Sequence, residues 1–299
     1  MKILITGPAG QVAFPLARAL ARTHEVWGLA RFRNPRDRER LEAVGVRCAA
    51  GDLAEGRFGG VPRDFDQVLN FAVAKSGDFD RDLAANAEGL GLLMMHCREA
   101  RALLHCSSTA VYQPAGHRPL GEDHPLGDNH RVFMPTYSLC KIAAEAMARF
   151  VARGLGIPTT IARLNVPYGD GGGWPAIHLE QILAGSPIAV SPEAPNVYNP
   201  IHDDDIAAML PRLLEIASVP ATIVNWAGSE PASIEEWCGY LGGLVDREPR
   251  FAVTGRTITS VAVDVARMHE RVGRTRVAWR DGMRRMVRAR HPELALSAD

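Results

Sequence analysis

The sequence predicts an α/β protein built on a doubly wound parallel sheet, and two observations support this prediction. Short aliphatic segments alternate with amphipathic helical segments through the first half of the chain. The first aliphatic segment, residues 2–6, runs into a turn that contains Gly7 and Gly10, and a helical pattern follows at once. Such alternation places parallel strands side by side with helices on both faces.

The predicted elements follow one another in a regular order. Six further strands are expected at residues 25–29, 46–50, 67–72, 103–107, 159–164 and 222–226. Helices are expected from Val12 onward and over residues 35–44, 82–100 and 137–154. Residues 109–135 are rich in proline and glycine, so we expect a loop that borders the functional site.

The turn at residues 7–10 has the composition of a phosphate-binding loop. A tight strand-to-helix turn leaves backbone N–H groups unpaired at the positive end of the helix, where a pyrophosphate can bind. Gly7 and Gly10 keep side chains out of that space, and Ala13 takes the place of a third glycine. A glycine-rich turn without a ligand shows the same pattern. Its position between a strand and a helix favours a Rossmann-like dinucleotide site.

The end of the second predicted strand indicates which dinucleotide is preferred. A carboxylate there binds the ribose hydroxyls of NAD, whereas an arginine accommodates the 2′-phosphate of NADP. The sequence has Arg31 at this position, with Arg33 and Arg36 close behind. We therefore expect NADP or NAD as cofactor, with Arg31 favouring NADP, and interpret Arg33 and Arg36 as solvated charges.

The rest of the chain fits this pattern less well and is assigned to a second unit. Residues 1–165, joined by about 198–227, form the predicted NAD(P)-binding Rossmann domain. Residues 166–197 and 228–299 are expected to form a smaller, mostly helical substrate-binding lobe, with His178 on the surface of one helix. Because ligands of doubly wound folds bind at the carboxyl ends of the strands, we expect the lobe to cover that edge.

Composition and charge limit the classes of partner and the cellular location that we expect. The chain has 34 Lys and Arg residues and 34 Asp and Glu residues, which gives no reason to expect a nucleic acid or a membrane as partner. No apolar run approaches the ~20 residues of a membrane helix. Because the first strand begins at residue 2, no signal or transit peptide is expected. The five cysteines form no CxxC pair, which favours free thiols in the cytoplasm over disulfides or a metal site.

Tyr137 and Lys141 form the first candidate for catalytic chemistry. They are four residues apart at the start of a predicted helix, and therefore one turn apart on the same face. A nearby ammonium favours the phenolate form of a tyrosine, which can then accept the proton of an alcohol while a nicotinamide accepts the hydride. Ser108, at the end of the fifth predicted strand, adds a hydroxyl that could hydrogen-bond the reacting oxygen. Its alternative role is to cap its own turn.

These motifs occur in an order that resembles the extended short-chain dehydrogenase/reductase family, in its NAD-dependent epimerase/dehydratase group. The resemblance covers nearly the whole chain. The matching segments are Thr6-Gly7-x-x-Gly10-x-x-Ala13, Gly51-Asp52-Leu53, residues 70–75, Asn86, residues 107–112, Tyr137-x-x-x-Lys141 and residues 201–207.

The resemblance implies a role for each matching residue. The cofactor residues would be Gly7, Gly10, Gln11 and Val12 at the pyrophosphate, Arg31 at the adenosine ribose or its phosphate, Asp52 and Leu53 beside the adenine, and Ala72 and Lys75 along the cofactor. Asn86 would brace the strand ends. The catalytic residues would be Tyr137 as acid/base, Lys141 at the nicotinamide ribose, and Ser108, or Thr109 in its place, at the substrate oxygen.

Three departures from the family pattern concern the substrate. Thr109 and Ala110 follow Ser108 where dehydratases carry Asp-Glu, so dehydration is disfavoured. Tyr198 stands where sugar-nucleotide enzymes often have an arginine that contacts the substrate diphosphate. Asn165 is displaced by one position within its motif. The cofactor residues are intact, and a substrate without a nucleotide stays open.

The sequence therefore favours an enzyme that uses NAD or NADP to move a hydride at a secondary alcohol or ketone of a sugar or sugar-like substrate. It would be an epimerase or an oxidoreductase. The alternatives are an NADPH-dependent carbonyl reductase acting on a substrate without a nucleotide, and a non-catalytic dinucleotide sensor. The expected partners are a small-molecule substrate and, from the resemblance, a second copy of the chain paired through the helices at residues 82–100 and 137–154.

Overall fold

A seven-stranded parallel sheet forms the centre of the computed structural model, which describes residues 1–297. The strand order is β12-β6-β5-β4-β1-β2-β3, and every neighbouring pair is parallel. The strands are β1 (Lys2–Thr6), β2 (Glu25–Ala30), β3 (Arg47–Ala50), β4 (Gln67–Asn70), β5 (Ala102–Ser108), β6 (Thr159–Leu164) and β12 (Thr222–Trp226). The predicted doubly wound parallel sheet is thus confirmed. The strand order reverses between β1 and β4, which is where such sheets open a ligand crevice.

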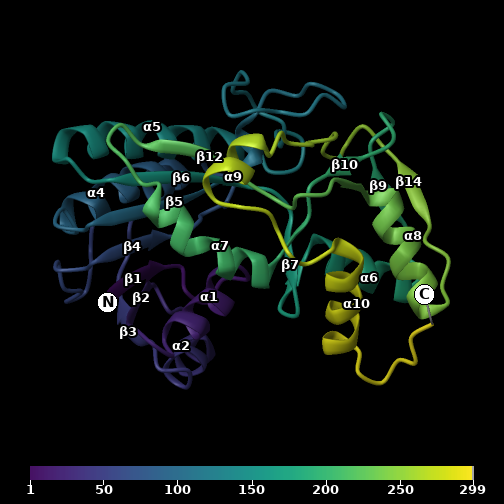
Figure 1. Cartoon of the computed structure of the whole chain (residues 1–299), viewed down its shortest axis with the longest axis horizontal. Helices are drawn as coiled ribbons and strands as arrows, with labels where there is room; N and C mark the ends of the chain where they lie inside the picture. The colour runs from purple at the N-terminus through teal and green to yellow at the C-terminus, as the bar shows by residue number, and fades with distance from the viewer. Residues whose placement is uncertain (298–299) are drawn as a thin grey trace.

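Helices cover both faces of this sheet (Figure 1). One face carries α1 (Ala13–Leu20), α2 (Pro35–Glu42) and α7 (Asp203–Glu215), which share a buried aliphatic core with the sheet. The other face carries α4 (Gly89–His96) and α5 (Tyr137–Leu155), with a second core beneath them. Each core removes apolar side chains from water on one side of the sheet, which is the main favourable contribution to folding.

The helix expected at residues 82–100 differs in its bounds and in its shape. It begins earlier, with α3 (Phe79–Leu83), because the Asp78 side chain accepts a hydrogen bond from the Arg81 N–H and caps the first turn. A π-helical turn, η1 (Ala84–Glu88), then leads into α4. Turns of this kind are frequent at functional sites, and this one contains Asn86.

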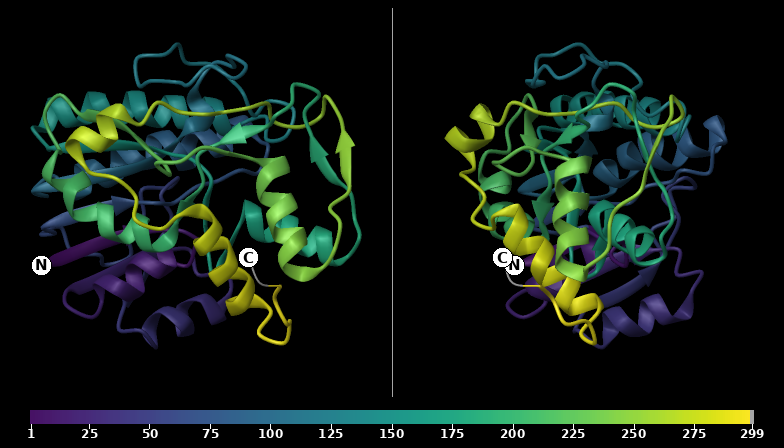
Figure 2. Two further views of the ribbon diagram at one scale, coloured as in Figure 1. Left: turned by 45° about the vertical axis from the view of Figure 1, so that its right-hand side comes forward. Right: turned by 90° about the vertical axis from the view of Figure 1, so that its right-hand side faces the viewer.

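In the described part of the chain, the second unit contains three helices around its own core, together with three small sheets to which residues 197–202 also contribute strands. Its helices are α6 (Trp174–Leu183), α8 (Ile234–Val245) and α10 (Trp279–Arg290), and α8 and α10 lie next to each other in both views of Figure 2. In the first small sheet β7 (Pro167–Gly169) lies between β11 (Ile201–His202) and β8 (Gly172–Gly173) and pairs with both. In the other two, β10 (Val197–Tyr198) pairs with β13 (Ala232–Ser233), and β9 (Ile188–Val190) pairs with β14 (Phe251–Val253). The chain also returns to the large sheet between β14 and α10, where α9 (Ala266–Arg271) lies against β12.

Candidate active site

The turn between β1 and α1 lies directly against the end of β4. Gly7 has a φ of +62°, and a Cβ at this position would lie 2.9 Å from the Cα of Ala72. The Ala72 N–H donates a 3.1 Å hydrogen bond to Thr6 Oγ1, and that hydroxyl donates to Asn70 Oδ1 at 2.6 Å. Only glycine combines this backbone conformation with so close an approach. The turn therefore keeps the open space beside it free of side chains, as a phosphate-binding turn requires.

Gln11 and Val12, the other two residues expected at the pyrophosphate, lie where this turn enters the helix. Val12 is the N-cap residue of α1, without a side-chain hydrogen bond, so the N–H groups of the first turn keep no side-chain acceptor there. The Gln11 side chain donates a 3.1 Å hydrogen bond to the carbonyl of Pro167 in β7. That amide is thus used to join the turn to the second unit.

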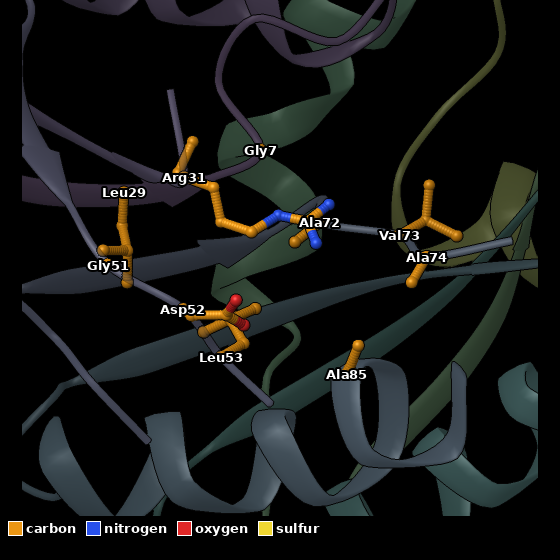
Figure 3. A pocket seen from close by; sticks show the side chains of 11 residues that line it. Gly7, Leu29, Arg31, Gly51, Asp52, Leu53, Ala72, Val73, Ala74 and Ala85 are labelled. Carbon is orange, nitrogen blue, oxygen red and sulfur yellow. The ribbon is translucent and has the colours of Figure 1, made fainter. Parts of the chain in front are cut away.

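A hollow of about 140 Å³ opens beside this turn at the carboxyl ends of β1 to β4 (Figure 3). Its lining brings together the predicted cofactor residues Gly7, Arg31, Asp52, Leu53 and Ala72. In Figure 3 the Arg31 side chain extends across the hollow toward Ala72. Within residues 1–297 its guanidinium makes no hydrogen bond or ion pair, so five donors are available to a ligand. The hollow and its free cation fit the adenosine half of a dinucleotide.

The floor of the hollow is held by two buried polar side chains on the helix that contains the π turn. Asn86 donates to the Ala74 carbonyl at 2.8 Å and accepts from the Ala74 N–H at 2.9 Å, as a bracing role requires. Asp82 accepts hydrogen bonds from Ser76 and, at 2.7 Å, from the Thr136 hydroxyl. Burial would raise the pKa of Asp82, but these hydrogen bonds hold it below the usual value. Asp82 thereby ties the segment after β4 to the start of α5.

Lys75, predicted to lie along the cofactor, is in this same segment. Its side chain is exposed, and the described part of the chain offers it no hydrogen bond or ion pair. Asn86 fixes the backbone at Ala74 next to it. Lys75 is not among the residues that line the hollow, so its place along the cofactor stays a prediction.

The first turn of α5 presents the predicted Tyr and Lys together. Tyr137 is half-buried and Lys141 is buried, and the Lys141 Nζ lies 5.9 Å from the centre of the Tyr137 ring. Lys141 also donates a 2.7 Å hydrogen bond to the carbonyl of Cys106 in β5. Helix α5 packs on β5, so this bond fixes the ammonium at the carboxyl end of the strand. The predicted spacing on one helical face is what the structure shows.

Ser108 and Thr109 follow at the end of β5, and their hydroxyl groups differ in availability. Ser108 Oγ accepts a 3.1 Å hydrogen bond from the Ala110 N–H, which caps the short turn η2 (Thr109–Val111). Its own O–H remains free to donate to a ligand. The Thr109 hydroxyl is buried and accepts a 3.0 Å hydrogen bond from Asn165. Ser108 is therefore the better placed of the two for a substrate oxygen.

Two histidines near this site were not anticipated from the sequence. His130 lies in the loop before α5, with its ring centre 5.6 Å from that of Tyr137. His105 lies in β5 and is bound by the Asn70 amide at 2.9 Å. Burial lowers the pKa of His130 to about 4, and burial together with Lys141 lowers the pKa of His105 well below its usual value. Both rings are thus neutral at physiological pH. The position of His130 in a loop expected to border the site was the one available signal.

The residues of the second unit form a closed aromatic core. Tyr198 is buried and donates a 2.8 Å hydrogen bond from its hydroxyl to the Thr259 carbonyl. Its ring packs edge-on against Trp174 at 5.1 Å. His178 is buried, not on the surface as expected, because its Nδ1 accepts a 2.9 Å hydrogen bond from Trp237. A helical pattern alone does not reveal such a partner from another helix.

Residues 1–297 contain neither a membrane-spanning helix nor a cluster of metal-binding side chains. The structure shows no helix long and apolar enough to cross a membrane. In the same part of the chain, no three His, Cys, Asp or Glu side chains are grouped so that they could hold a metal ion.

The sequence of the chain matches the model of a known protein family. The family model described as the NAD dependent epimerase/dehydratase family matches residues 3–225. The chain belongs to this family. The resemblance to this family is thereby confirmed, and the matched range spans the β1–α1 turn and the segments that contain Arg31, Ser108, Tyr137 and Lys141. No curated protein sequence matches the chain.

Solved structures of epimerases and dehydratases share the fold of this family member. A UDP-glucuronic acid 4-epimerase from Bacillus cereus, in complex with UDP-glucuronic acid and NAD, is 18% identical with a TM-score of 0.82, over 98% of this chain and 100% of that one. A dTDP-glucose 4,6-dehydratase from Streptomyces venezuelae with NAD bound is 22% identical with a TM-score of 0.81, over 98% and 97%. A UDP-glucose 4-epimerase from Thermotoga maritima with UDP-glucose is 17% identical with a TM-score of 0.81, over 98% and 99%. At these identities the likeness concerns the fold.

Proposed function

We propose that this protein uses NAD or NADP to transfer a hydride at a secondary alcohol or ketone of a sugar or sugar-like substrate. The observation that carries the proposal is the pairing of Tyr137 and Lys141 on the first turn of α5, beside the end of β5. This pairing occurs in a member of the epimerase/dehydratase family. Family membership and an intact acid/base pair together support an enzyme over a dinucleotide sensor.

Each of the three catalytic side chains has a separate task in this proposal. Tyr137 takes the proton of the substrate hydroxyl during oxidation and returns it during reduction. The free O–H of Ser108 donates a hydrogen bond to the same substrate oxygen, and Lys141 stabilises negative charge on the tyrosine oxygen. A bound nicotinamide would supply the acceptor and donor of the hydride.

We propose NADP as the preferred cofactor because of Arg31. Its guanidinium borders the adenosine hollow and has no partner within residues 1–297. A fork of N–H donors suits a phosphate better than a pair of hydroxyl groups. Two of the similar solved structures named above contain NAD, so a preference for NAD is the alternative that a binding experiment must exclude.

Two observations favour different substrates. The similar solved structures are named with UDP-glucose, UDP-glucuronic acid or dTDP-glucose chemistry, which supports a nucleotide sugar. The neutral, buried Tyr198 supports the second candidate, an NADPH-dependent carbonyl reductase acting on a substrate without a nucleotide. In either case Thr109 and Ala110 supply no acid or base after Ser108, which argues against dehydration.

We also propose a homodimer in the cytoplasm. Helices α4 and α5 pack together on one face of the sheet and expose Leu92, Met95 and Phe150, and Phe150 is 75% exposed. Apolar side chains of this size on adjacent helices favour contact with a second copy. All five cysteines are free thiols, which supports a reducing compartment.

A binding titration followed by a turnover assay tests the proposal. Protein stripped of nucleotide is titrated with NADPH and NADH by fluorescence, and any dinucleotide released on denaturation is identified. UDP-glucose, UDP-glucuronic acid and dTDP-glucose are then assayed for epimerisation, and ketoses for NADPH oxidation. Tight binding and turnover of one substrate are expected. Protein that binds neither dinucleotide, or that turns over nothing, would overturn the proposal.

A further inference from the structure

His130 occupies a fixed place beside the proposed acid/base. Its ring centre lies 5.6 Å from that of Tyr137, with 39° between the ring planes. The His130 carbonyl accepts a 2.7 Å hydrogen bond from the Met134 N–H, and the Met134 carbonyl accepts one of 3.1 Å from the Tyr137 N–H. The turn that holds the imidazole is therefore continuous with the first turn of α5.

Asn129 determines which nitrogen of this imidazole carries the proton. The buried Asn129 amide donates to the carbonyls of Thr109 at 3.2 Å and Tyr112 at 3.1 Å. Because carbonyls only accept, the NH₂ group must face them, and Asn129 Oδ1 must face His130 Nδ1. An amide oxygen is an acceptor, so Nδ1 carries the hydrogen. Asn129 also connects the imidazole to the turn that follows Ser108.

The opposite nitrogen, Nε2, consequently carries a lone pair and no hydrogen. It makes no hydrogen bond within residues 1–297, and it is not among the enclosed polar atoms that lack a partner. It is therefore open to a ligand. His105 shows the contrasting case, since its unpartnered Nε2 is enclosed in the protein. Burial lowers the pKa of His130 to about 4, so the lone pair persists at neutral pH.

We propose that Nε2 of His130 accepts a hydrogen bond from a second hydroxyl group of the substrate, close to the carbon that Tyr137 serves. His130 would then be a positioning residue that selects hydroxylated substrates over isolated carbonyl compounds. The inference rests on the proposed function, because it places the substrate at Tyr137. It adds a specificity determinant that the Ser-Tyr-Lys set does not contain, and it identifies the substrate class as a polyol or hydroxyketone.

Two substitutions separate this role from a purely structural one. The side-chain amide of His130→Asn can donate to Asn129 as Nδ1 does, but it leaves nothing at the position of Nε2. The longer side chain of His130→Gln can place an amide oxygen near that position. The probes are a matched pair for each candidate function: UDP-glucose with its 3-deoxy analogue, and dihydroxyacetone with acetone.

With the hydroxylated probe, kcat/KM of His130→Asn should fall by about 10-fold to 100-fold, largely through KM, as expected for one lost hydrogen bond to a polar ligand. The unhydroxylated probe should be affected much less, and His130→Gln should recover part of the loss. An equal loss on both probes would show a structural role and overturn the inference, as would unchanged kinetics. Should the wild-type protein turn over none of these probes and none of the nucleotide sugars and ketoses of the turnover assay above, the proposed function itself would fail and the inference with it.

Nitrogen-15 NMR of the protein saturated with NADP tests the protonation state directly. At pH 7, His130 should show a protonated Nδ1 and an unprotonated Nε2, and addition of the hydroxylated probe should shift the Nε2 resonance. A protonated Nε2, or no shift while the probe is being turned over, would overturn the inference and leave the proposed function intact.

Discussion

The ammonium of Lys141 lies 5.9 Å from the centre of the Tyr137 ring and is anchored to the carbonyl of Cys106. The pair joins the first turn of α5 to the end of β5. Because the hydroxyl of Tyr137 is the only part that Tyr137→Phe removes, this variant should keep the fold and the dinucleotide affinity. Its kcat should fall by about 10²-fold to 10⁴-fold, the usual contribution of a positioned acid/base. Steady-state kinetics and a fluorescence titration measure the two quantities, and unchanged kcat would contradict the assigned role.

Arg31 should determine the choice between NADP and NAD. Arg31→Ala should weaken NADPH binding by about 10-fold to 100-fold, since a hydrogen bond to a charged group contributes about 1.5–3 kcal/mol. NADH affinity should change little. Arg33→Ala is the matched control, because Arg33 is also exposed but does not line the hollow. Equal losses for both dinucleotides in Arg31→Ala would show that the guanidinium does not recognise the 2′-phosphate.

The buried ion pair between Arg163 and Glu145 should be essential to the stability of the folded protein. Arg163 and Glu145 are 3% and 4% exposed, and Arg163 donates to both carboxylate oxygens, at 3.0 and 2.7 Å. Glu145→Ala leaves the guanidinium uncompensated, so the free energy of unfolding should fall by about 3–5 kcal/mol. The exposed pair of Arg38 and Glu42 provides the control, and Glu42→Ala should cost less than about 1 kcal/mol. Urea denaturation measures both, and similar losses would contradict the argument.

Asp203 should make stability depend on pH. Burial, together with Asp170 and Asp204, raises its pKa to about 7, against 3.8 as the ordinary value. The folded state therefore holds a proton that the unfolded chain has already released, and stability falls as pH rises from about 4 to 7. Asp203→Asn removes this pH-dependent loss of stability. The variant should match the wild type near pH 4 and exceed it by up to about 4 kcal/mol at pH 8, from 1.36 kcal/mol per pKa unit.

The measurement for Asp203 is urea denaturation of both proteins at pH 5, 6, 7 and 8. Titrating groups that do not interact with Asp203 contribute equally to the two proteins, so the difference between them isolates this carboxyl group and its coupling to Asp170 and Asp204. A difference that stays constant with pH would show that Asp203 titrates near its ordinary value in the folded protein.

Much of the fold and part of the site could be predicted from local sequence patterns. All seven strands of the large sheet lie where the aliphatic segments placed them, and Gly7 has the positive φ that its turn requires. Tyr137 and Lys141 share a helical face because four residues make about one turn. These features depend on residues close together in the chain, where periodicity and backbone sterics act directly.

Other features were decided only by contacts between distant residues. Asp82 binds Thr136 across 54 positions, and Arg163 meets Glu145 between a strand and a helix. His178 is buried against Trp237 of another helix, which donates a hydrogen bond to it. The hydrophobic periodicity of a single helix gives no information about such a partner. The neutral state of His130 needs burial, and its tautomer needs the carbonyls that orient Asn129. The sequence by itself determined the sheet and the spacing of the chemistry, whereas burial and long-range hydrogen bonds, which exist only in the folded chain, decided the charge and orientation of the groups around it.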